Sequence, residues 1–341
     1  MDTIKGLREY IGTAKYRKAM GLPEEVCEEY KLLAQGEYNM NYLFTHPVSR
    51  RKFLLRVNCE SQMHLKNQIE YEYHALELLR DSGRTPDVFY VDGSLERLGH
   101  GVLVMEYLPG CALDYRKDME AAARCLADIH SVPVSAADGL LCPKEPLRAI
   151  LEECEDMVKV YMDSPLGNPE TKDMIRRLLD EGWERLARTE NCRGYRCCIN
   201  TELNSTNFLI NGGNEGNYLI DWEKPLYGEP AQDLGHFLAP TTTFWKTDVI
   251  LTPQETGEFL EKYAEAVEGR FPVDGLRERV STYIPITCLR GVTWCAMAWV
   301  QYQQPDKLIF NESTHKKLEA YLSHEFLKML ARDFFRIKAD F

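Results

Sequence analysis

The first third of the chain consists of short apolar runs separated by turn-forming residues. Five of these runs have the length and the β-branched or aromatic content that favour strands. They are residues 30–33, 40–45, 52–57, 88–91 and 101–105. Between the third and the fourth run, apolar residues recur at spacings of three and four and predict a helix over 65–79. After a helical N-terminal segment, we therefore expect three strands, one helix and two strands in a small α+β unit.

The rest of the chain has the apolar spacing of helices. Six helices are predicted, over residues 118–130, 147–161, 171–188, 253–267, 276–301 and 315–337. A hairpin interrupts them, because apolar residues 208–210 and 218–220 flank a loop rich in Gly and Asn. Residues 240–245 are expected to form a polar loop.

The turn-forming Leu108-Pro109-Gly110 separates these two patterns. It predicts a β-rich N-terminal lobe, residues 1–107, and a larger, mostly helical C-terminal lobe, residues 108–341. The sequence therefore favours an α+β protein with two lobes.

Composition narrows the classes of partner. Of 341 residues, 41 are Lys or Arg and 53 are Asp or Glu, for a formal net charge of -12. No run of five or more basic residues occurs, so we expect neither nucleic acid nor a membrane surface as a partner.

The eleven cysteines lack CxxC spacing and are expected to be reduced thiols. The most apolar stretch, 291–300, is shorter than the about 20 residues of a membrane span, and residues 1–20 lack a signal-peptide core. We expect a cytoplasmic protein.

Glu72 falls on the apolar stripe of the predicted 65–79 helix, so its carboxylate is expected to face the sheet. A buried carboxylate needs a cationic partner, and the 52–57 strand offers Arg56. Kinase-type folds use such a pair to aim a positive charge at nucleotide phosphates. The alternative is that Glu72 lies at the edge of the stripe and Arg56 faces water.

A second polar group surrounds the predicted hairpin. Because a tight hairpin brings its ends together, Asn207 and Asp221 are expected to be neighbours. A carboxylate and an amide oxygen suit Mg²⁺. Glu202, five residues before Asn207, is placed to orient or deprotonate an attacking hydroxyl. The alternative is a polar hairpin whose Asn and Asp side chains only cap turns.

Several short motifs follow one another in an order that resembles a known family. They are LVMEYLPG at 103–110, LADIH at 126–130, NFLI at 207–210, LIDWE at 219–223, GEPAQDL at 228–234, and a helix with Trp294 and Gln301. Together they resemble the aminoglycoside phosphotransferase and choline kinase-like family over residues 33–299. The resemblance implies a protein-kinase-like, two-lobed fold and transfer of phosphate from ATP to a hydroxyl of a small molecule.

The resemblance also implies roles on the nucleotide side. Arg56 would contact the ATP phosphates with Glu72 as its partner. Gly36 would lie in the loop that covers them, although that loop is poorer in glycine than is usual in the family. The backbone from Glu106 to Leu108 would hold adenine.

For the metal, the resemblance implies that Asn207 and Asp221 bind Mg²⁺ and that Glu223 serves a second ion. The chain departs from the family at the catalytic loop, where Asn200 and Glu202 replace the usual His-x-Asp pair. Glu keeps the carboxylate but displaces its oxygen by roughly an ångström, and misplacement on that scale costs on the order of 100-fold in rate. We expect Glu202 and Asn200 to act in an active kinase, with a nucleotide-binding pseudokinase of regulatory role as the alternative.

Asp233, Trp245 and Trp294 are the candidates for lining the acceptor pocket, since all three follow the metal-binding segment. Aromatic faces and carboxylates favour a cationic acceptor such as choline, another amino alcohol or an aminoglycoside. Alternatively, the tryptophans pack in the core and Asp233 caps a helix. A small-molecule kinase is the leading hypothesis, ahead of the pseudokinase and of a helical binding protein without a nucleotide site.

Overall fold

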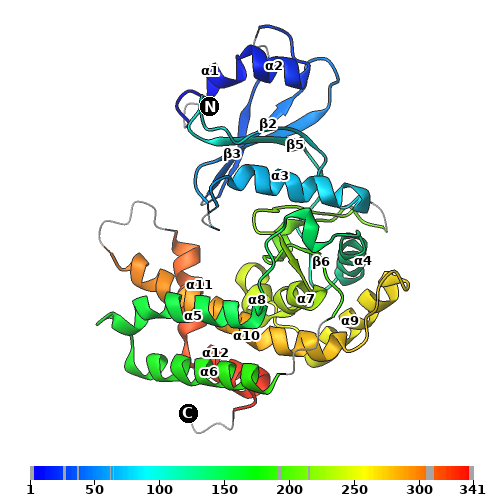
Figure 1. Cartoon of the computed structure of the whole chain (residues 1–341). Helices are drawn as coiled ribbons and strands as arrows, with labels where there is room; N and C mark the ends of the chain where they lie inside the picture. The colour runs from blue at the N-terminus through cyan, green and yellow to red at the C-terminus, as the bar shows by residue number, and fades with distance from the viewer. Residues whose placement is uncertain are drawn as a thin grey trace.

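The structure, a computed structural model, describes residues 4–25, 28–36, 38–61, 63, 65–189, 194–213, 216–304 and 311–337. Its elements form a small β-rich N-terminal lobe above a larger helical C-terminal lobe (Figure 1). The α+β, two-lobed fold predicted from the sequence is confirmed.

A five-stranded antiparallel sheet forms the N-terminal lobe, in the order β1-β2-β3-β5-β4. The strands are β1 (Lys31–Gln35), β2 (Asn39–Thr45), β3 (Lys52–Asn58), β4 (Val88–Asp92) and β5 (Gly101–Glu106). Helices α1 (Leu7–Ile11) and α2 (Ala14–Met20) cover one face, and α3 (Gln68–Leu79) covers the face toward the C-terminal lobe (Figure 1). The short helix η1 (Arg80–Ser82) follows α3.

Alternation along β3 decides which side chains face which lobe. Successive residues of a strand point to opposite faces. Leu55 and Val57 are fully buried in the cluster that contains α1 and α2. Arg56, between them, points to the other face, where Ile69 and Leu76 of α3 pack. The sheet therefore directs one cation toward the junction of the lobes.

Nine helices of the described residues form most of the C-terminal lobe. They are α4 (Met119–His130), α5 (Pro146–Asp163), α6 (Pro169–Arg188), α7 (Pro230–Leu238), α8 (Pro240–Thr247), α9 (Pro253–Val267), α10 (Leu276–Tyr302), α11 (Glu312–Leu322) and α12 (His324–Met329). Short helical turns are η2 (Ala136–Asp138), η3 (Ser205–Asn207) and η4 (Leu330–Phe335). The long helix α10 packs against α5, α7 and α11 and so forms the centre of the lobe.

Two short antiparallel strand pairs lie at the top of this lobe. Strand β6 (Cys197–Ile199) pairs with β9 (Leu226–Gly228). Strand β7 (Phe208–Leu209) pairs with β8 (Tyr218–Leu219) and forms the predicted hairpin. Of the predicted hairpin loop 211–217, residues 214 and 215 lie outside the described residues. The catalytic-loop motif thus connects β6 to β7.

Two sequence expectations about secondary structure were wrong. Residues 240–245 form helix α8 instead of a polar loop, because Pro240 starts a helix and Thr241 to Thr243 are buried against the lobe. The predicted 315–337 helix is interrupted at Ser323, whose backbone is extended and whose Oγ accepts a hydrogen bond from Phe326 N–H. No helix within the described ranges is long and apolar enough to cross a membrane.

The connection between the lobes passes close to β7. Gly110 has φ +149°, and a Cβ placed there would come within 2.7 Å of the Leu209 side chain. Cys111 then pairs with Ile210 through backbone hydrogen bonds of 3.0 and 2.8 Å. Only glycine fits this close approach. This explains why a glycine follows Pro109 at the predicted lobe boundary.

Candidate active site

An ion pair between Arg56 and Glu72 lies beneath the sheet. Arg56 Nη1 is 2.6 Å from Glu72 Oε1, and the two side chains are 7% and 2% exposed. Burial raises the pKa of Glu72, and the adjacent guanidinium offsets this only in part. For Arg56, burial alone would lower the pKa, but the surrounding carboxylates outweigh it and raise the pKa. The contact predicted from the helical stripe of α3 is present.

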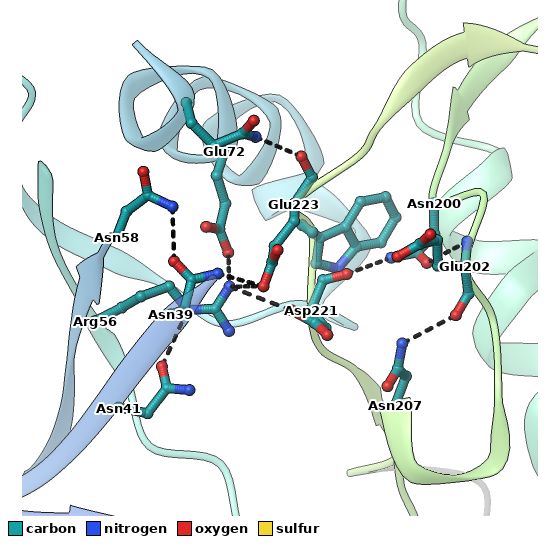
Figure 2. A network of polar contacts seen from close by, with 12 residues as sticks. Asn39, Asn41, Arg56, Asn58, Glu72, Asn200, Glu202, Asn207, Asp221 and Glu223 are labelled. Atoms are coloured by element: carbon teal, nitrogen blue, oxygen red, sulfur yellow. Dashed lines mark hydrogen bonds and ion pairs between the residues drawn. The ribbon is translucent and has the colours of Figure 1, made fainter. Parts of the chain in front are cut away.

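Two more carboxylates reach Arg56 from the segment after β8. Arg56 Nη1 lies 3.3 Å from Asp221 Oδ1 and 3.5 Å from Glu223 Oε1. We call Arg56, Glu72, Asp221 and Glu223 the Arg56 cluster (Figure 2). Burial and the neighbouring Asp221 charge raise the pKa of Glu223 to about 8. With three carboxylates for one guanidinium, the cluster favours an additional cation.

Three asparagines of β2 and β3 extend this cluster. Asn39 and Asn41 are two residues apart on β2 and therefore share a face. Asn41 Oδ1 accepts a hydrogen bond from Arg56 Nε at 3.1 Å. Asn58 Nδ2 donates to Asn39 Oδ1 at 2.9 Å, and Asn39 in turn donates to Glu223 (Figure 2). Sequence reasoning missed the asparagines, although their alternation with buried residues on β2 was the available signal.

Asn207 and Asp221 are neighbours at the ends of the β7–β8 hairpin, as predicted. Ile220 N–H donates to the Asn207 carbonyl at 2.9 Å. Asn207 Nδ2 donates to the Glu202 carbonyl at 3.1 Å, and its Oδ1 makes no hydrogen bond with any described residue. Asp221 has φ +67°, a left-handed conformation that a non-glycine residue adopts at some cost. The hairpin thus presents an amide oxygen and a carboxylate side by side.

This pair suits a metal that takes further ligands from elsewhere. Within the described ranges, no group of three or more His, Cys, Asp or Glu side chains is arranged to hold a metal ion. Mg²⁺ is commonly bound through one or two protein oxygens and keeps water and phosphate oxygens as its other ligands. Asn207 and Asp221, next to the carboxylate excess of the Arg56 cluster, fit that pattern.

Asp233 holds the loop that follows β6. Its carboxylate accepts hydrogen bonds from Asn200 N–H at 2.7 Å and from Thr201 N–H at 2.6 Å. His130 Nε2 lies 3.3 Å from the same carboxylate. Asp233 is fully buried. It therefore does not line the acceptor pocket, contrary to the prediction, because its oxygens fix the loop backbone.

Asn200 joins this loop to the segment that carries Asp221. Its Nδ2 donates to the Asp221 carbonyl at 2.8 Å, and its Oδ1 accepts from Glu202 N–H at 3.1 Å (Figure 2). The side chain is almost completely buried. Asn200 thus links Glu202 to Asp221, and the catalytic role predicted for it stays a prediction.

Glu202 lies between two cations. Its Oε1 accepts hydrogen bonds from Lys224 Nζ at 2.9 Å and from Arg290 Nη2 at 3.2 Å. Arg290 also donates to Glu153 through Nε at 2.9 Å. We call Glu153, Glu202, Lys224 and Arg290 the Arg290 cluster. Burial acts to raise the pKa of Glu202, but Lys224 and Arg290 outweigh it and lower the pKa. Glu202 is therefore an anion suited to orienting a hydroxyl.

A pocket of about 330 Å³ opens beside Glu202. Trp245 of α8 and Trp294 of α10 line it, with ring centroids 5.5 Å apart and planes at 85°. Glu153 and Arg290 also contribute to its wall. Both tryptophans are partly buried and pack against the core as well. The pocket thus brings the predicted tryptophans to the same cavity as Glu202.

The predicted nucleotide-binding backbone lies at the end of β5. Glu106 is the last residue of β5, and Leu108 N–H makes no hydrogen bond with any described residue. Gly36 N–H donates to the Asn39 carbonyl at 2.9 Å and closes the β1–β2 turn. Residue 37, in the predicted phosphate loop, lies outside the described residues. An unused donor at Leu108 is compatible with the predicted adenine contact.

Three residues in or next to the pocket were not identified from the sequence. Lys224 directly follows the predicted metal-binding segment, and Arg290 precedes Trp294 by one helical turn. His236 of α7 lines the pocket, and burial together with Arg290 lowers its pKa to about 4, so it is neutral at pH 7. Of the three, only Arg290 could have been found from the sequence, because it lies four residues before Trp294 and so on the same face of the predicted helix.

Known proteins resemble this chain in sequence pattern and in fold. A family model described as the phosphotransferase enzyme family matches residues 29–278. Comparison with curated protein sequences finds no match.

Solved structures of similar fold include a choline kinase from Cryptosporidium parvum, with 13% identity and a TM-score of 0.64 over 96% of this chain and 97% of that one. A Plasmodium vivax ethanolamine kinase has 14% identity and a TM-score of 0.59 over 88% and 84%. A spectinomycin phosphotransferase in complex with ADP and spectinomycin has 16% identity and a TM-score of 0.54 over 88% of each chain. At these identities the likeness concerns the fold.

Proposed function

The chain belongs to the phosphotransferase enzyme family, and from this premise we propose that it transfers the γ-phosphate of ATP to a hydroxyl of a small cationic molecule. The observation that carries the proposal is the Asn200 side chain. It hydrogen-bonds both Glu202 N–H and the Asp221 carbonyl. Asn200 therefore fixes the backbone of Glu202, which would orient the acceptor, relative to the backbone of Asp221, which would bind the metal.

On the nucleotide side, Arg56 would contact the ATP phosphates and Leu108 the adenine. Asn207 and Asp221 would hold Mg²⁺, with Glu223 nearby for a second ion. The excess of carboxylates in the Arg56 cluster supports this assignment, since a divalent cation would offset it. When bound, the metal supplies charge stabilisation for the transferred phosphoryl group.

The reaction is a transfer of one phosphoryl group. The acceptor oxygen forms a bond to the γ-phosphorus, and the bond from that phosphorus to the β–γ bridging oxygen breaks. ADP leaves with the bonding electrons, and the hydroxyl proton passes by way of Glu202 to water. Because phosphoryl transfer depends mainly on positioning and electrostatics, an orienting carboxylate of lowered pKa is sufficient for this role.

On the acceptor side, the pocket beside Glu202 supports a cationic molecule. Trp245 and Trp294 supply aromatic faces, and Glu153 supplies a carboxylate. Aromatic faces attract organic cations. Among proteins of similar fold are a choline kinase, an ethanolamine kinase and a phosphotransferase crystallised with spectinomycin. Amino alcohols and aminoglycosides are accordingly the first acceptors to test.

The test is ATP turnover with Mg²⁺ and a panel of amino alcohols, aminoglycosides and sugars, followed by ADP release and by detection of the phosphorylated product. We expect product with at least one cationic acceptor. Phosphorylation of neutral sugars only would refute the cationic acceptor, and absence of product from every acceptor would refute the kinase.

The Glu202→Gln variant separates a kinase from a pseudokinase. In a kinase, we expect Glu202→Gln to lower kcat by about 100-fold while ATP with Mg²⁺ still raises the melting temperature. In a pseudokinase, ATP raises the melting temperature of the wild type but no product forms. A binding protein without a nucleotide site would show no ATP-induced shift at all.

A further inference from the structure

Arg290 lines the pocket beside Glu202 and hydrogen-bonds both of its carboxylates, Glu153 and Glu202. Arg290 Nε and Nη2 donate to Glu153 at 2.9 and 3.3 Å, and Nη2 also donates to Glu202 at 3.2 Å. The side chain is 22% exposed. It lines the 330 Å³ pocket with the tryptophans, and a neighbouring pocket of about 190 Å³ that Lys224 also lines.

The guanidinium has hydrogen-bonding capacity that the protein leaves unused. A guanidinium carries five N–H donors. Those of Nε and Nη2 are directed to Glu153 and Glu202, while Nη1 makes no hydrogen bond or ion pair with any described residue. Nη1 is not among the fully buried side-chain atoms without a partner, so a molecule in the pocket can reach it. Nη1 is therefore the donor in this pocket that a ligand oxygen would satisfy.

The four charges of the Arg290 cluster, which borders the pocket, are balanced before any ligand binds. Glu153 and Glu202 contribute two negative charges, and Lys224 and Arg290 contribute two positive ones. His236, also at the pocket, is neutral at pH 7 because burial lowers its pKa. An acceptor that carries a carboxylate as well as an ammonium group would keep this balance.

We propose that the acceptor is a zwitterion, namely a small hydroxylated amino acid whose carboxylate binds Nη1 of Arg290. The inference rests on the proposed function, since it specifies the acceptor of the same pocket. The ammonium group would lie against Glu153 and the tryptophans, and the hydroxyl would face Glu202. Arg290 and Trp294 are four residues apart on α10 and so lie on one face of the helix. A single small molecule can reach both, and a guanidinium is well suited to binding a carboxylate.

Two matched pairs of acceptors test the proposal. L-Serine differs from ethanolamine, and L-homoserine from 3-aminopropan-1-ol, only by the carboxylate. We expect the wild type to have a kcat/KM about tenfold or more higher for the carboxylate-bearing member of at least one pair. That is the size of one hydrogen bond to a charged group. In Arg290→Met, this ratio should fall to about 1, mainly through KM.

Three further results make the test decisive. Arg177→Met, which removes a surface arginine paired with Asp173 on α6, should keep the wild-type ratio. If Arg290 only positions Glu202, then Arg290→Met will lower kcat equally for both members of a pair and leave the ratio unchanged, which refutes the inference. Preference of the wild type for the amino alcohols also refutes it, but leaves the proposed kinase function intact. Turnover of no acceptor of either kind refutes both.

Discussion

The candidate active site contains two arginines in opposite electrostatic settings. In the Arg56 cluster, one guanidinium faces three carboxylates, and burial helps to raise the pKa of Glu223 to about 8. In the Arg290 cluster, two cations face two carboxylates, and the pKa of Glu202 is lowered. The first setting favours a divalent cation, whereas the second favours an organic ligand with both charges. The proposed function accordingly assigns the Arg56 cluster to metal and nucleotide and the Arg290 cluster to the acceptor.

The two clusters also differ in what they connect. Arg56 and Glu72 come from β3 and α3, while Asp221 and Glu223 come from the segment after β8 (Figures 1 and 2). The Arg56 cluster therefore joins the two lobes. All four members of the Arg290 cluster come from residues after the Pro109-Gly110 turn. The Arg290 cluster thus lies within one lobe, although Tyr38 of the other lobe also lines the pocket beside it.

Removal of the carboxylate next to Asn207 should have the largest effect. We expect Asp221→Ala to lower kcat/KM by about 1000-fold, because the variant would lose a carboxylate ligand of the metal that stabilises transition-state charge. Steady-state ADP release at saturating Mg²⁺ measures the effect, and Asp81→Ala, at the surface after α3, is the control. Full activity of Asp221→Ala would refute the metal assignment and the contrast between the clusters.

Removal of the Arg56 cation should cost stability. Arg56→Met leaves Glu72 buried without a partner, and loss of one member of a buried ion pair costs about 3–5 kcal/mol in free energy of unfolding. Urea denaturation measures the loss. The double variant Arg56→Met/Glu72→Leu should regain most of the stability without regaining ATP binding. If the single variant is as stable as the wild type, the pair is not the buried link described above.

The Glu223 carboxyl predicts a pH dependence of stability without metal. Its folded pKa of about 8 lies above the about 4.3 of an unfolded Glu, so the native state binds more protons between these values. The free energy of unfolding should therefore fall as pH rises through this window and level off above it, by at most about 1.4 kcal/mol per pH unit. Urea denaturation from pH 5 to 8 in EDTA measures the slope.

The matched variant for this slope is Glu223→Gln, in which we expect a flatter pH dependence. Equal slopes in the two proteins would show that the carboxylate excess around Arg56 is absent in solution.

Removal of a carboxylate from the Arg290 cluster should have the smallest effect on the free energy of unfolding. Glu153 is 44% exposed and its arginine partner 22%, and ion pairs of this exposure contribute about 1 kcal/mol or less. Glu153→Gln should therefore lower the free energy of unfolding by no more than that. Glu145→Gln, which removes a surface partner of Arg148, is the matched control. A loss as large as that of Arg56→Met would contradict the contrast between the two clusters.

The sequence predicted those contacts of the site that depend on the regular spacing of apolar residues in a helix or on a tight hairpin. The helical stripe of α3 led to the Arg56–Glu72 contact, and the hairpin between β7 and β8 led to the neighbouring Asn207 and Asp221. Each of these depends on a regular spacing of apolar residues or on a tight turn, which a sequence shows directly.

Contacts between distant segments were not predictable in the same way. Arg290 binds Glu153 and Glu202, which are 137 and 88 residues away along the chain. Strands β6 and β9 have only three residues each, too few for a visible period. Helix α8 is rich in Thr, a weak helix former, and its stability comes from burial in the lobe. In each case, tertiary packing decides the structure.

The most direct test of the account is a crystal structure with a non-hydrolysable ATP analogue and Mg²⁺. The account predicts the metal at about 2.1 Å from the Asn207 and Asp221 side-chain oxygens, Arg56 on the phosphates, and the γ-phosphate directed toward Glu202. Nucleotide bound elsewhere, or metal held by Glu202 and Glu153 in the acceptor pocket, would contradict it.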